Sequence, residues 1–151
     1  MSKYKKQSHV IYKCDYHIVW VPKYRFRILG GDIGKSVDED IRKLSEWLGC
    51  EVLELNVRSD HVHVVVSIPP RVSVSIYVGT IKGKIGIRIF KTYPVLKKKP
   101  YWGNHFWARG YFVNTVGIDE DMIKRYVKYQ EEEDRKEEQD GKDFTQMNLG
   151  I

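Results

Sequence analysis

Asp60-His61-Val62-His63-Val64-Val65-Val66-Ser67-Ile68-Pro69-Pro70 is the stretch from which the rest of the chain can be interpreted. It is rich in β-branched residues and ends in two prolines, which favours a short strand. Side chains alternate between the two faces of a strand, so His61 and His63 share one face and the valines at 62, 64 and 66 share the other. Two neighbouring imidazoles can hold a divalent metal. Alternatively, they are polar side chains on the wet face of an ordinary amphipathic strand.

The chain has 151 residues, of which 42% are hydrophobic and 30% are charged, as expected for one soluble globular domain. We expect a single domain over residues 1–151, with its core at about 10–135 and flexible ends at 1–9 and 139–151. No apolar run approaches the roughly 20 residues of a membrane span, and no secretory apolar core follows the Lys-rich start. These features predict a cytoplasmic protein. Walker-loop, GxSxG, zinc-finger and repeat patterns are absent from the sequence.

Charge is distributed unevenly along the chain. Residues 71–110 contain nine basic residues and no acidic one, whereas residues 111–151 contain six basic and eleven acidic residues. A 40-residue segment without a carboxylate indicates a surface that meets a polyanion, most simply nucleic acid. The alternative is a basic face that the acidic C-terminal segment balances.

Hydrophobic periodicity and turn residues predict a series of strands and helices. An alternating strand spans residues 10–21, and a helix then begins at a capping box, Ser36 with Glu39, and ends at Gly49. A strand at 51–58 follows, which turns Leu53, Leu55 and Val57 to one face and forms an antiparallel hairpin with the histidine strand. The remaining elements are a helix at 73–91, a strand at 106–113 and a helix at 119–138.

The segment 73–91 is ambiguous, because Ile85, Ile87 and Ile89 also alternate as in a strand. We favour a helix, since Val74, Val78, Ile81, Ile85 and Ile89 recur at helical spacing and the sheet needs a cover. The order strand, helix, strand, strand, helix, strand predicts an α+β fold: a ferredoxin-like or RRM-like βαββαβ antiparallel sheet with helices on one face. A C-terminal tyrosine-bearing helix is added to it. The histidine strand would be central, with its histidines on the open face.

The last predicted helix offers residues that could complete a reactive centre. Tyr126 and Gln130 lie four residues apart and therefore on one helix face. A glutamine carbonyl can complete a site for Mg²⁺ or Mn²⁺, and a tyrosine can attack a phosphodiester and hold the product covalently. The alternative is that Tyr126 is a core aromatic residue beside Met122 and Ile123. No residue of the sequence is identified as the base that would activate Tyr126.

Several segments together resemble a known family, the single-tyrosine HUH transposases of insertion-sequence 200/605 type. The resemblance covers about residues 10–135, in order and at the expected separations. The segments that carry it are Tyr16-His17-Ile18-Val19-Trp20-Val21-Pro22-Lys23-Tyr24-Arg25, Asp60-His61-Val62-His63, Ile68-Pro69-Pro70, Ser73-Val74-Ser75, Lys82-Gly83-Lys84, Phe106-Trp107-Ala108-Arg109-Gly110-Tyr111-Phe112-Val113 and Tyr126-Val127-Lys128-Tyr129-Gln130.

The resemblance implies a mechanism and assigns residues to it. His61, His63 and Gln130 would be the metal ligands, with Mg²⁺ or Mn²⁺ as the cofactor, and Tyr126 would be the nucleophile. The family cuts single-stranded DNA at hairpin-bearing element ends, forms a 5′-phosphotyrosine and a free 3′-OH, and then rejoins strands. It works as a homodimer, commonly with the tyrosine helix of one subunit completing the metal site of the other.

Basic residues that lie among aromatic residues or along the expected helix are candidates for DNA contact. They are Lys23, Arg25, Arg27, Lys82, Lys84, Arg88 and Arg109. Two other functions stay open at this stage. One is a domesticated HUH endonuclease that acts on chromosomal hairpin repeats, and the other is a non-catalytic module that binds single-stranded nucleic acid.

Overall fold

A computed structural model describes residues 4–98, 105–115 and 117, and residues 128, 132, 135 and 136 singly. The chain divides into two compact units, residues 1–116 and 117–151. In the second unit the four singly described residues are helical, and all four fall within the helix predicted over 119–138. The prediction of one domain over the whole chain stays a prediction. In the described part of the chain, every helix is too short or too polar to cross a membrane.

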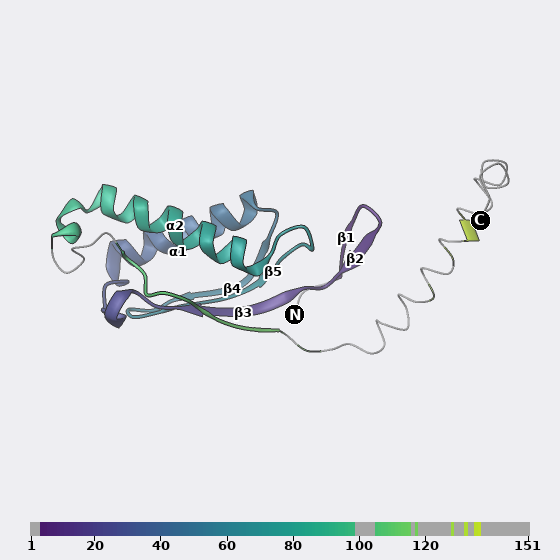
Figure 1. Ribbon diagram of the computed structural model, residues 1–151, viewed down its shortest axis with the longest axis horizontal. Helices are drawn as coiled ribbons and strands as arrows, with labels where there is room; N and C mark the ends of the chain where they lie inside the picture. Colours follow the sequence, from purple (N-terminus) through teal and green to yellow (C-terminus); the bar gives the residue numbers. More distant parts are fainter. Residues whose placement is uncertain are drawn as a thin grey trace. The chain divides into compact units, whose positions relative to one another are not determined.

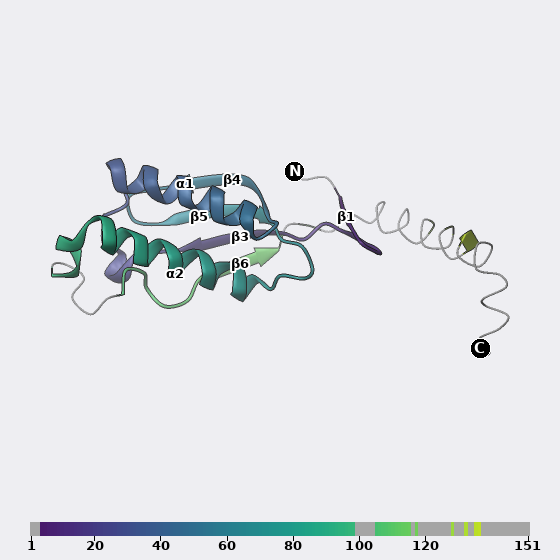
Figure 2. The same ribbon diagram turned by 90° about the horizontal axis from the view of Figure 1, so that it is seen from above.

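The first unit is built on a four-stranded antiparallel sheet with the strand order β4-β5-β3-β6. Its strands are β3 at Asp15–Trp20, β4 at Glu51–Val57, β5 at Val62–Ser67 and β6 at Phe112–Thr115. The helices α1 (Gly31–Trp47) and α2 (Val74–Thr92) both lie on one face of this sheet, as Figure 1 shows. Seen from above, α1 lies over the β4 side and α2 over the β6 side (Figure 2). The predicted βαββαβ fold with a central histidine strand is confirmed.

The first predicted strand, over residues 10–21, is not continuous. Its beginning, β2 (Val10–Tyr12), pairs with β1 (Lys5–Gln7) in a small hairpin, whereas β3 pairs with β5 and β6 in the main sheet. Residues 5–7, which were expected in a flexible end, therefore form a strand, because β2 takes them as its pairing partner.

Helix α1 begins earlier than the capping box predicted. Its N-cap is Gly30, and Ser36 lies inside the helix. Glycine explains the early start, because a Cβ at Gly34 would lie 2.2 Å from the backbone oxygen of Leu29. Only a residue without a side chain allows the helix to approach the preceding loop this closely.

Strand β4 contains a bulge between Val52 and Glu54, which corrects the predicted face of one residue. Leu55 and Val57 pack against the core as predicted, but Val52 takes the third place on that side. Leu53 lies beside His17 on the opposite face of the sheet. A bulge adds one residue to a strand, so the residues before it and the residues after it follow opposite alternations. The sequence pattern alone does not reveal where this happens.

The last strand among the described residues is β6 at Phe112–Thr115, so the strand predicted at 106–113 is wrong in its position. Phe106 and Trp107 are neighbours, yet both are buried, at 2% and 8% exposure. A strand would turn them to opposite faces. Instead both pack into the core beside α2, and Trp107 forms an isolated bridge with Pro22.

Helix α2 confirms the helical interpretation of residues 73–91. Ser73 caps it by accepting a hydrogen bond from the Ile76 backbone at 3.0 Å. Ile85 and Ile89 are buried at 0% and 1% exposure, while Ile87 is 71% exposed. This is the spacing of a helix, because a strand would turn all three isoleucines to the same face.

Two polar contacts join α1 to α2. Asp40, which is buried, accepts a hydrogen bond from Nη1 of Arg88 at 2.8 Å. The hydroxyl groups of Ser45 and Tyr77 lie 2.6 Å apart inside the core. Burial raises the pKa of Tyr77 to about 12, so its phenol stays protonated and remains able to donate.

We predict that Ile85→Ala lowers the free energy of unfolding by about 2–5 kcal/mol, because it leaves a cavity where a fully buried side chain packs. The matched control is Ile87→Ala on the same helix, which should change stability by less than about 0.5 kcal/mol. Urea denaturation followed by circular dichroism measures both. Equal losses in the two variants would contradict the helix register.

Candidate active site

The two predicted metal-binding histidines belong to the centre of the sheet. Val62, Val64 and Val66 of β5 have 0% exposure and pack against the helices. His63 alternates with them and therefore lies on the face away from α1 and α2. His61 immediately precedes β5 and has the same orientation by alternation; its side chain is 35% exposed. The prediction that the histidine face is opposite to the valine face is confirmed for His63.

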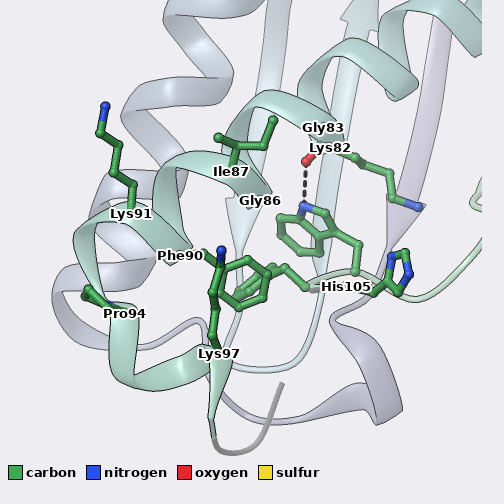
Figure 3. A pocket seen from close by; sticks show the side chains of 11 residues that line it. Lys82, Gly83, Gly86, Ile87, Phe90, Lys91, Pro94, Lys97 and His105 are labelled. Carbon is green, nitrogen blue, oxygen red and sulfur yellow. Dashed lines mark hydrogen bonds between the residues drawn. The ribbon is translucent and has the colours of Figure 1, made fainter. Parts of the chain in front are cut away.

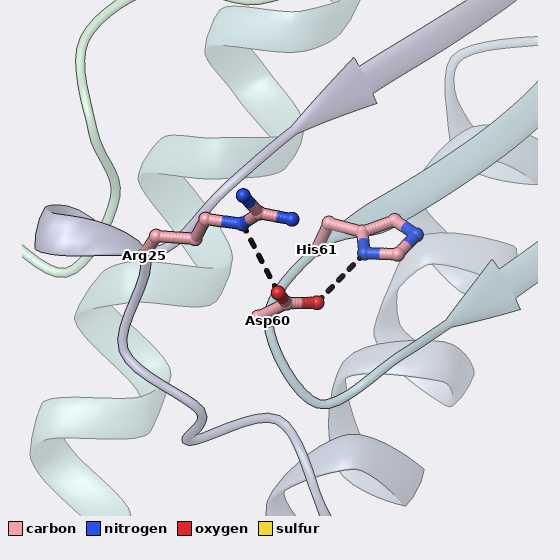
Figure 4. Close-up of polar contacts among 3 residues, drawn as sticks. All are labelled: Arg25, Asp60 and His61. Atoms are coloured by element: carbon pink, nitrogen blue, oxygen red, sulfur yellow. Dashed lines mark hydrogen bonds and ion pairs between the residues drawn. The ribbon is translucent and has the colours of Figure 1, made fainter.

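His61 is oriented by a carboxylate. Its Nδ1 lies 2.8 Å from Oδ1 of Asp60, and Oδ2 of Asp60 accepts a hydrogen bond from Nε of Arg25 at 3.0 Å (Figure 4). An ionised carboxylate can only accept a hydrogen bond, so Nδ1 of His61 is the donor, and in the neutral imidazole the lone pair is then on Nε2. The hydrogen bond from His61, with help from the charge of Arg25, holds the pKa of Asp60 below its ordinary value. Asp60 is therefore ionised at neutral pH.

His63 has a partner on the neighbouring strand that sequence reasoning missed. Nδ1 of His17 lies 3.2 Å from Nε2 of His63, and the two rings stack at 5.5 Å between centroids. In the register of β3 and β5, Val19 opposes His63, so His17 is its diagonal neighbour. The alternation of residues 10–21 places His17 on a definite face, but only the strand register reveals that this face carries His63.

The segment that delivers Arg25 to Asp60 is a strained turn. Tyr24 and Arg25 have φ angles of 56° and 54°, a conformation that costs a residue other than glycine about 1–3 kcal/mol. A backbone hydrogen bond also holds this turn: the Lys23 N–H donates to the backbone oxygen of Phe106 at 2.9 Å. One result is that Tyr24 is 74% exposed, with Nζ of Lys23 lying 5.3 Å from the centroid of its ring. The exposed aromatic ring of Tyr24 thus directly precedes, in the chain, the arginine that pairs with Asp60.

The donor set suits a divalent cation. A histidine that gives its Nδ1–H to a carboxylate is the arrangement found around metal-binding histidines, because it fixes the ring and raises the basicity of the other nitrogen. Within residues 4–98 and 105–115, no three His, Cys, Asp or Glu side chains gather into a metal site by themselves. The predicted third ligand, Gln130, and the predicted nucleophile, Tyr126, lie outside the described residues, so both assignments stay predictions.

The sequence model of the family described as "Transposase IS200 like" matches residues 10–130. The chain belongs to this transposase family. The resemblance to the insertion-sequence 200/605 type is thereby confirmed.

Named relatives agree with this membership. The chain is 40% identical over 139 residues to the transposase for insertion sequence element IS200 of Salmonella typhimurium, covering 92% of this chain and 91% of that one. It is 31% identical over 131 residues to the ISDra2 transposase TnpA of Deinococcus radiodurans, covering 86% of this chain and 93% of the relative.

Solved structures share the fold. A crystal structure of a putative transposase from Deinococcus radiodurans R1 superposes with a TM-score of 0.67 at 29% identity, over 85% of this chain and 96% of that one. A REP-associated tyrosine transposase bound to a REP hairpin superposes with a TM-score of 0.55 at 14% identity, over 83% of this chain and 68% of that one. The second likeness shows the fold alone.

The basic residues predicted to contact DNA divide into two groups in this transposase. Lys23, Arg25, Arg27 and Arg109 lie in the turn regions, and the last three are exposed. Of these four, Arg25 also pairs with Asp60, and the three predicted residues of α2 make contacts within the protein as well. Nζ of Lys84 lies 5.4 Å from the centroid of the Trp47 ring, Arg88 pairs with buried Asp40, and Nζ of Lys82 donates to the backbone oxygens of Ala108 and Gly110 at 2.8 and 2.9 Å.

Lys82 therefore has a structural role that its place in a basic segment concealed. Burial lowers the pKa of its ammonium group, and two of its three N–H donors are used by carbonyls of the loop that precedes β6. A contact with a backbone far away in the sequence leaves no local signal, so sequence reasoning had no means to find it.

We predict that Lys82→Met lowers the free energy of unfolding by about 1–3 kcal/mol, because two carbonyl groups lose a charged donor. Lys91→Met, an exposed change on the same helix, is the control and should stay within about 0.5 kcal/mol of the parent. Chemical denaturation in parallel measures both. If Lys82→Met left stability unchanged and weakened DNA binding alone, Lys82 would be a DNA contact and not a structural tether.

Proposed function

We propose that this transposase cleaves and rejoins single DNA strands at the ends of an insertion sequence through a 5′-phosphotyrosine on Tyr126. The observation that carries the proposal is the histidine pair, in which Oδ1 of Asp60 lies 2.8 Å from Nδ1 of His61 and His63 follows two residues later in β5. Membership of the transposase family supports the reaction class. The relatives at 40% identity are transposases of insertion sequences, which favours this function over a domesticated endonuclease.

The proposed cleavage is one in-line displacement. The phenolate oxygen of Tyr126 forms a bond to the phosphorus of the scissile phosphodiester, and the bond from phosphorus to the 3′ oxygen breaks. The tyrosine proton leaves to solvent or a base, and the 3′ oxygen takes up a proton to become a 3′-OH. In the reverse direction, a 3′-OH from another strand attacks the phosphotyrosine and releases Tyr126. One phosphoester replaces another in each step, so no external energy source is needed.

Within this scheme His61, His63 and Gln130 would hold Mg²⁺ or Mn²⁺. When bound, such a cation polarises the phosphoryl oxygen and stabilises the leaving oxygen. The protein itself supplies orientation: Asp60 fixes the ring of His61 with Nε2 available, and His17 contacts Nε2 of His63 at 3.2 Å. Two imidazole nitrogens and an amide oxygen are donors that such a cation would accept.

We further propose that the substrate is single-stranded DNA with hairpins at the element ends, and that the protein acts on it in the cytoplasm as a homodimer. In that dimer the helix that bears Tyr126 would complete the site of the second subunit. The basic residues of the turn beside the histidines support a DNA substrate, because Arg25 and Arg27 are exposed next to an exposed aromatic ring. A non-catalytic binding module would keep these features but form no covalent product.

Tyr126→Phe should abolish cleavage and the covalent product while leaving DNA affinity within about twofold, because it removes only the nucleophilic oxygen. The assay is incubation of single-stranded DNA from the flanks of the gene with the protein and Mg²⁺ or Mn²⁺, followed by a denaturing gel. Tyr129→Phe is the control and should retain the adduct. An adduct formed by Tyr126→Phe would contradict the assignment, and no adduct with the parent protein would support the binding module.

Asp60→Ala should weaken Mn²⁺ binding by about 10–100-fold, because the ring of His61 loses the carboxylate that orients it. Asp60→Asn keeps an acceptor oxygen, so its Mn²⁺ affinity should fall between that of the parent protein and that of Asp60→Ala. Calorimetric titration with Mn²⁺ measures the affinity. The control is Asp38→Ala, which removes an acid that pairs with Arg42 on the surface of α1 at 2.8 Å.

The lowered pKa of Asp60 determines how the stability of the folded site depends on pH. Since the pKa of Asp60 is lowered, the carboxylate stabilises the folded site above its ordinary pKa, and this contribution is lost as the pH falls through the lowered value. The contribution of the Asp60 carboxylate to the stability of the folded site should therefore not change with pH around neutrality. Unchanged Mn²⁺ affinity in Asp60→Ala would contradict the orienting role of this carboxylate.

A further inference from the structure

A cavity of about 630 Å³ lies between the second half of α2 and the segment that precedes β6 (Figure 3). It is separate from the histidine pair, because α2 covers the opposite face of the sheet. Its size is typical of a site for a small organic group. The residues that line it are Lys82, Gly83, Gly86, Ile87, Phe90, Lys91, Pro94, Lys97, His105, Phe106 and Trp107.

The inner wall of the cavity is apolar and firmly fixed. Phe106 packs edge-to-face against both Trp107, at 4.7 Å between ring centroids, and Phe90, at 5.9 Å. The indole Nε1 of Trp107 donates to the backbone oxygen of Lys82 at 3.0 Å, as the dashed line in Figure 3 marks. Rings held in this way provide a preformed surface, so a ligand would not have to order them.

The rim of the cavity is basic. Lys91 and Lys97 are exposed, and Nζ of Lys97 lies 5.9 Å from the centroid of the Phe90 ring. His105 is also exposed. None of the described residues that line the cavity is acidic, and the sequence from residue 71 to 110 contains no acidic residue. The chemistry therefore fits an anion that carries a flat, apolar part.

Gly83 leaves the helix backbone bare at this cavity. A Cβ there would meet nothing within 4 Å in the part of the chain that the structure describes, so packing against these residues does not require a glycine. A glycine inside a helix costs about 1 kcal/mol relative to alanine. At Gly86, by contrast, a Cβ would be in ordinary contact with Phe106 at 3.6 Å. Next to Gly83, the side chain of Ile87 is 71% exposed and forms an apolar wall.

We propose that this cavity binds one unpaired nucleotide of the DNA substrate. Its base would lie against Ile87, the aromatic wall and the bare backbone at Gly83, while its phosphate would meet Lys91 and Lys97. The inference rests on the proposed function, since it takes DNA as the substrate. Because the cavity lies on the helix side of the sheet, the bound nucleotide is not the one that is cleaved, and the cavity selects the substrate.

The test uses the full-length protein and single-stranded oligonucleotides that cover the flanks of the gene, with one base at a time replaced by an abasic site. Two variants are compared with the parent. Gly83→Leu fills the cavity, whereas Gly79→Leu introduces the same side chain one turn away, where a Cβ would also meet nothing within 4 Å and which does not line the cavity. Both changes favour the helix, so both variants should fold, which thermal unfolding checks.

For the parent, an abasic site at one unpaired position should lower affinity about tenfold, as expected for the loss of one stacked base. Gly83→Leu should lose about tenfold on the intact oligonucleotide and nothing further at that abasic position, while Gly79→Leu should behave as the parent. The position of the sensitive base shows whether it comes from a hairpin loop or from a single-stranded flank.

The proposal is overturned if the abasic site lowers the affinity of Gly83→Leu as much as it lowers that of the parent. It is also overturned if both leucine variants lose affinity equally on every oligonucleotide. Its failure is distinguishable from failure of the proposed function. If no abasic position lowers the affinity but the covalent adduct still forms, the nucleotide site is overturned and the phosphotyrosine mechanism is not. A position-specific abasic effect without an adduct supports the nucleotide site and counts against the phosphotyrosine mechanism.

Discussion

The structure depends on the two-residue period of β5. Val62, Val64 and Val66 are fully buried against the helices, so the strand cannot slip by one residue without exposing all three and burying the histidines. The same constraint that builds the core therefore sets the direction of His61 and His63. Because β5 lies between β4 and β3, the histidines also acquire partners from outside their strand. Arg25 and Asp60 hold one ring and His17 contacts the other.

The segment from Phe106 to Gly110 connects the turn that carries Arg25 with the cavity beside α2. On one side, its backbone pairs with the turn that carries Arg25: the Lys23 backbone donates to the Phe106 oxygen, and the Ala108 backbone donates to the Val21 oxygen at 3.0 Å. On the other side, Lys82 of α2 donates to the oxygens of Ala108 and Gly110. The strain of the turn at Tyr24 and Arg25 is therefore supported by the same segment that provides the aromatic wall of the cavity.

Much of this architecture could be predicted where a pattern is local. The alternation in β5 and the spacing of Ile81, Ile85 and Ile89 in α2 are properties of consecutive residues, and both predictions are confirmed. The strand placed at 106–113 is wrong because two adjacent aromatic residues are both buried, which a long-range contact with α2 makes possible. The contact between His17 and His63 depends on the register of two strands. The hydrogen bonds of Lys82 to backbone oxygens depend on the packing of a loop. The assignments of Tyr126 and Gln130 rest on resemblance to the family and stay predictions.

The charge pattern of the sequence overstates the number of cations that are available to DNA. In the basic segment from 71 to 110, Lys82 is hydrogen-bonded to backbone carbonyls, Arg88 pairs with a buried carboxylate, and Lys84 lies over an aromatic ring. Each of these cations would have to give up an internal contact before it could pair fully with a phosphate. A smaller number of phosphate contacts means a weaker dependence of affinity on salt. For the proposed single-stranded substrate, contacts with bases would then contribute more to recognition, and the aromatic wall beside α2 and the exposed ring of Tyr24 are surfaces on which such contacts can form.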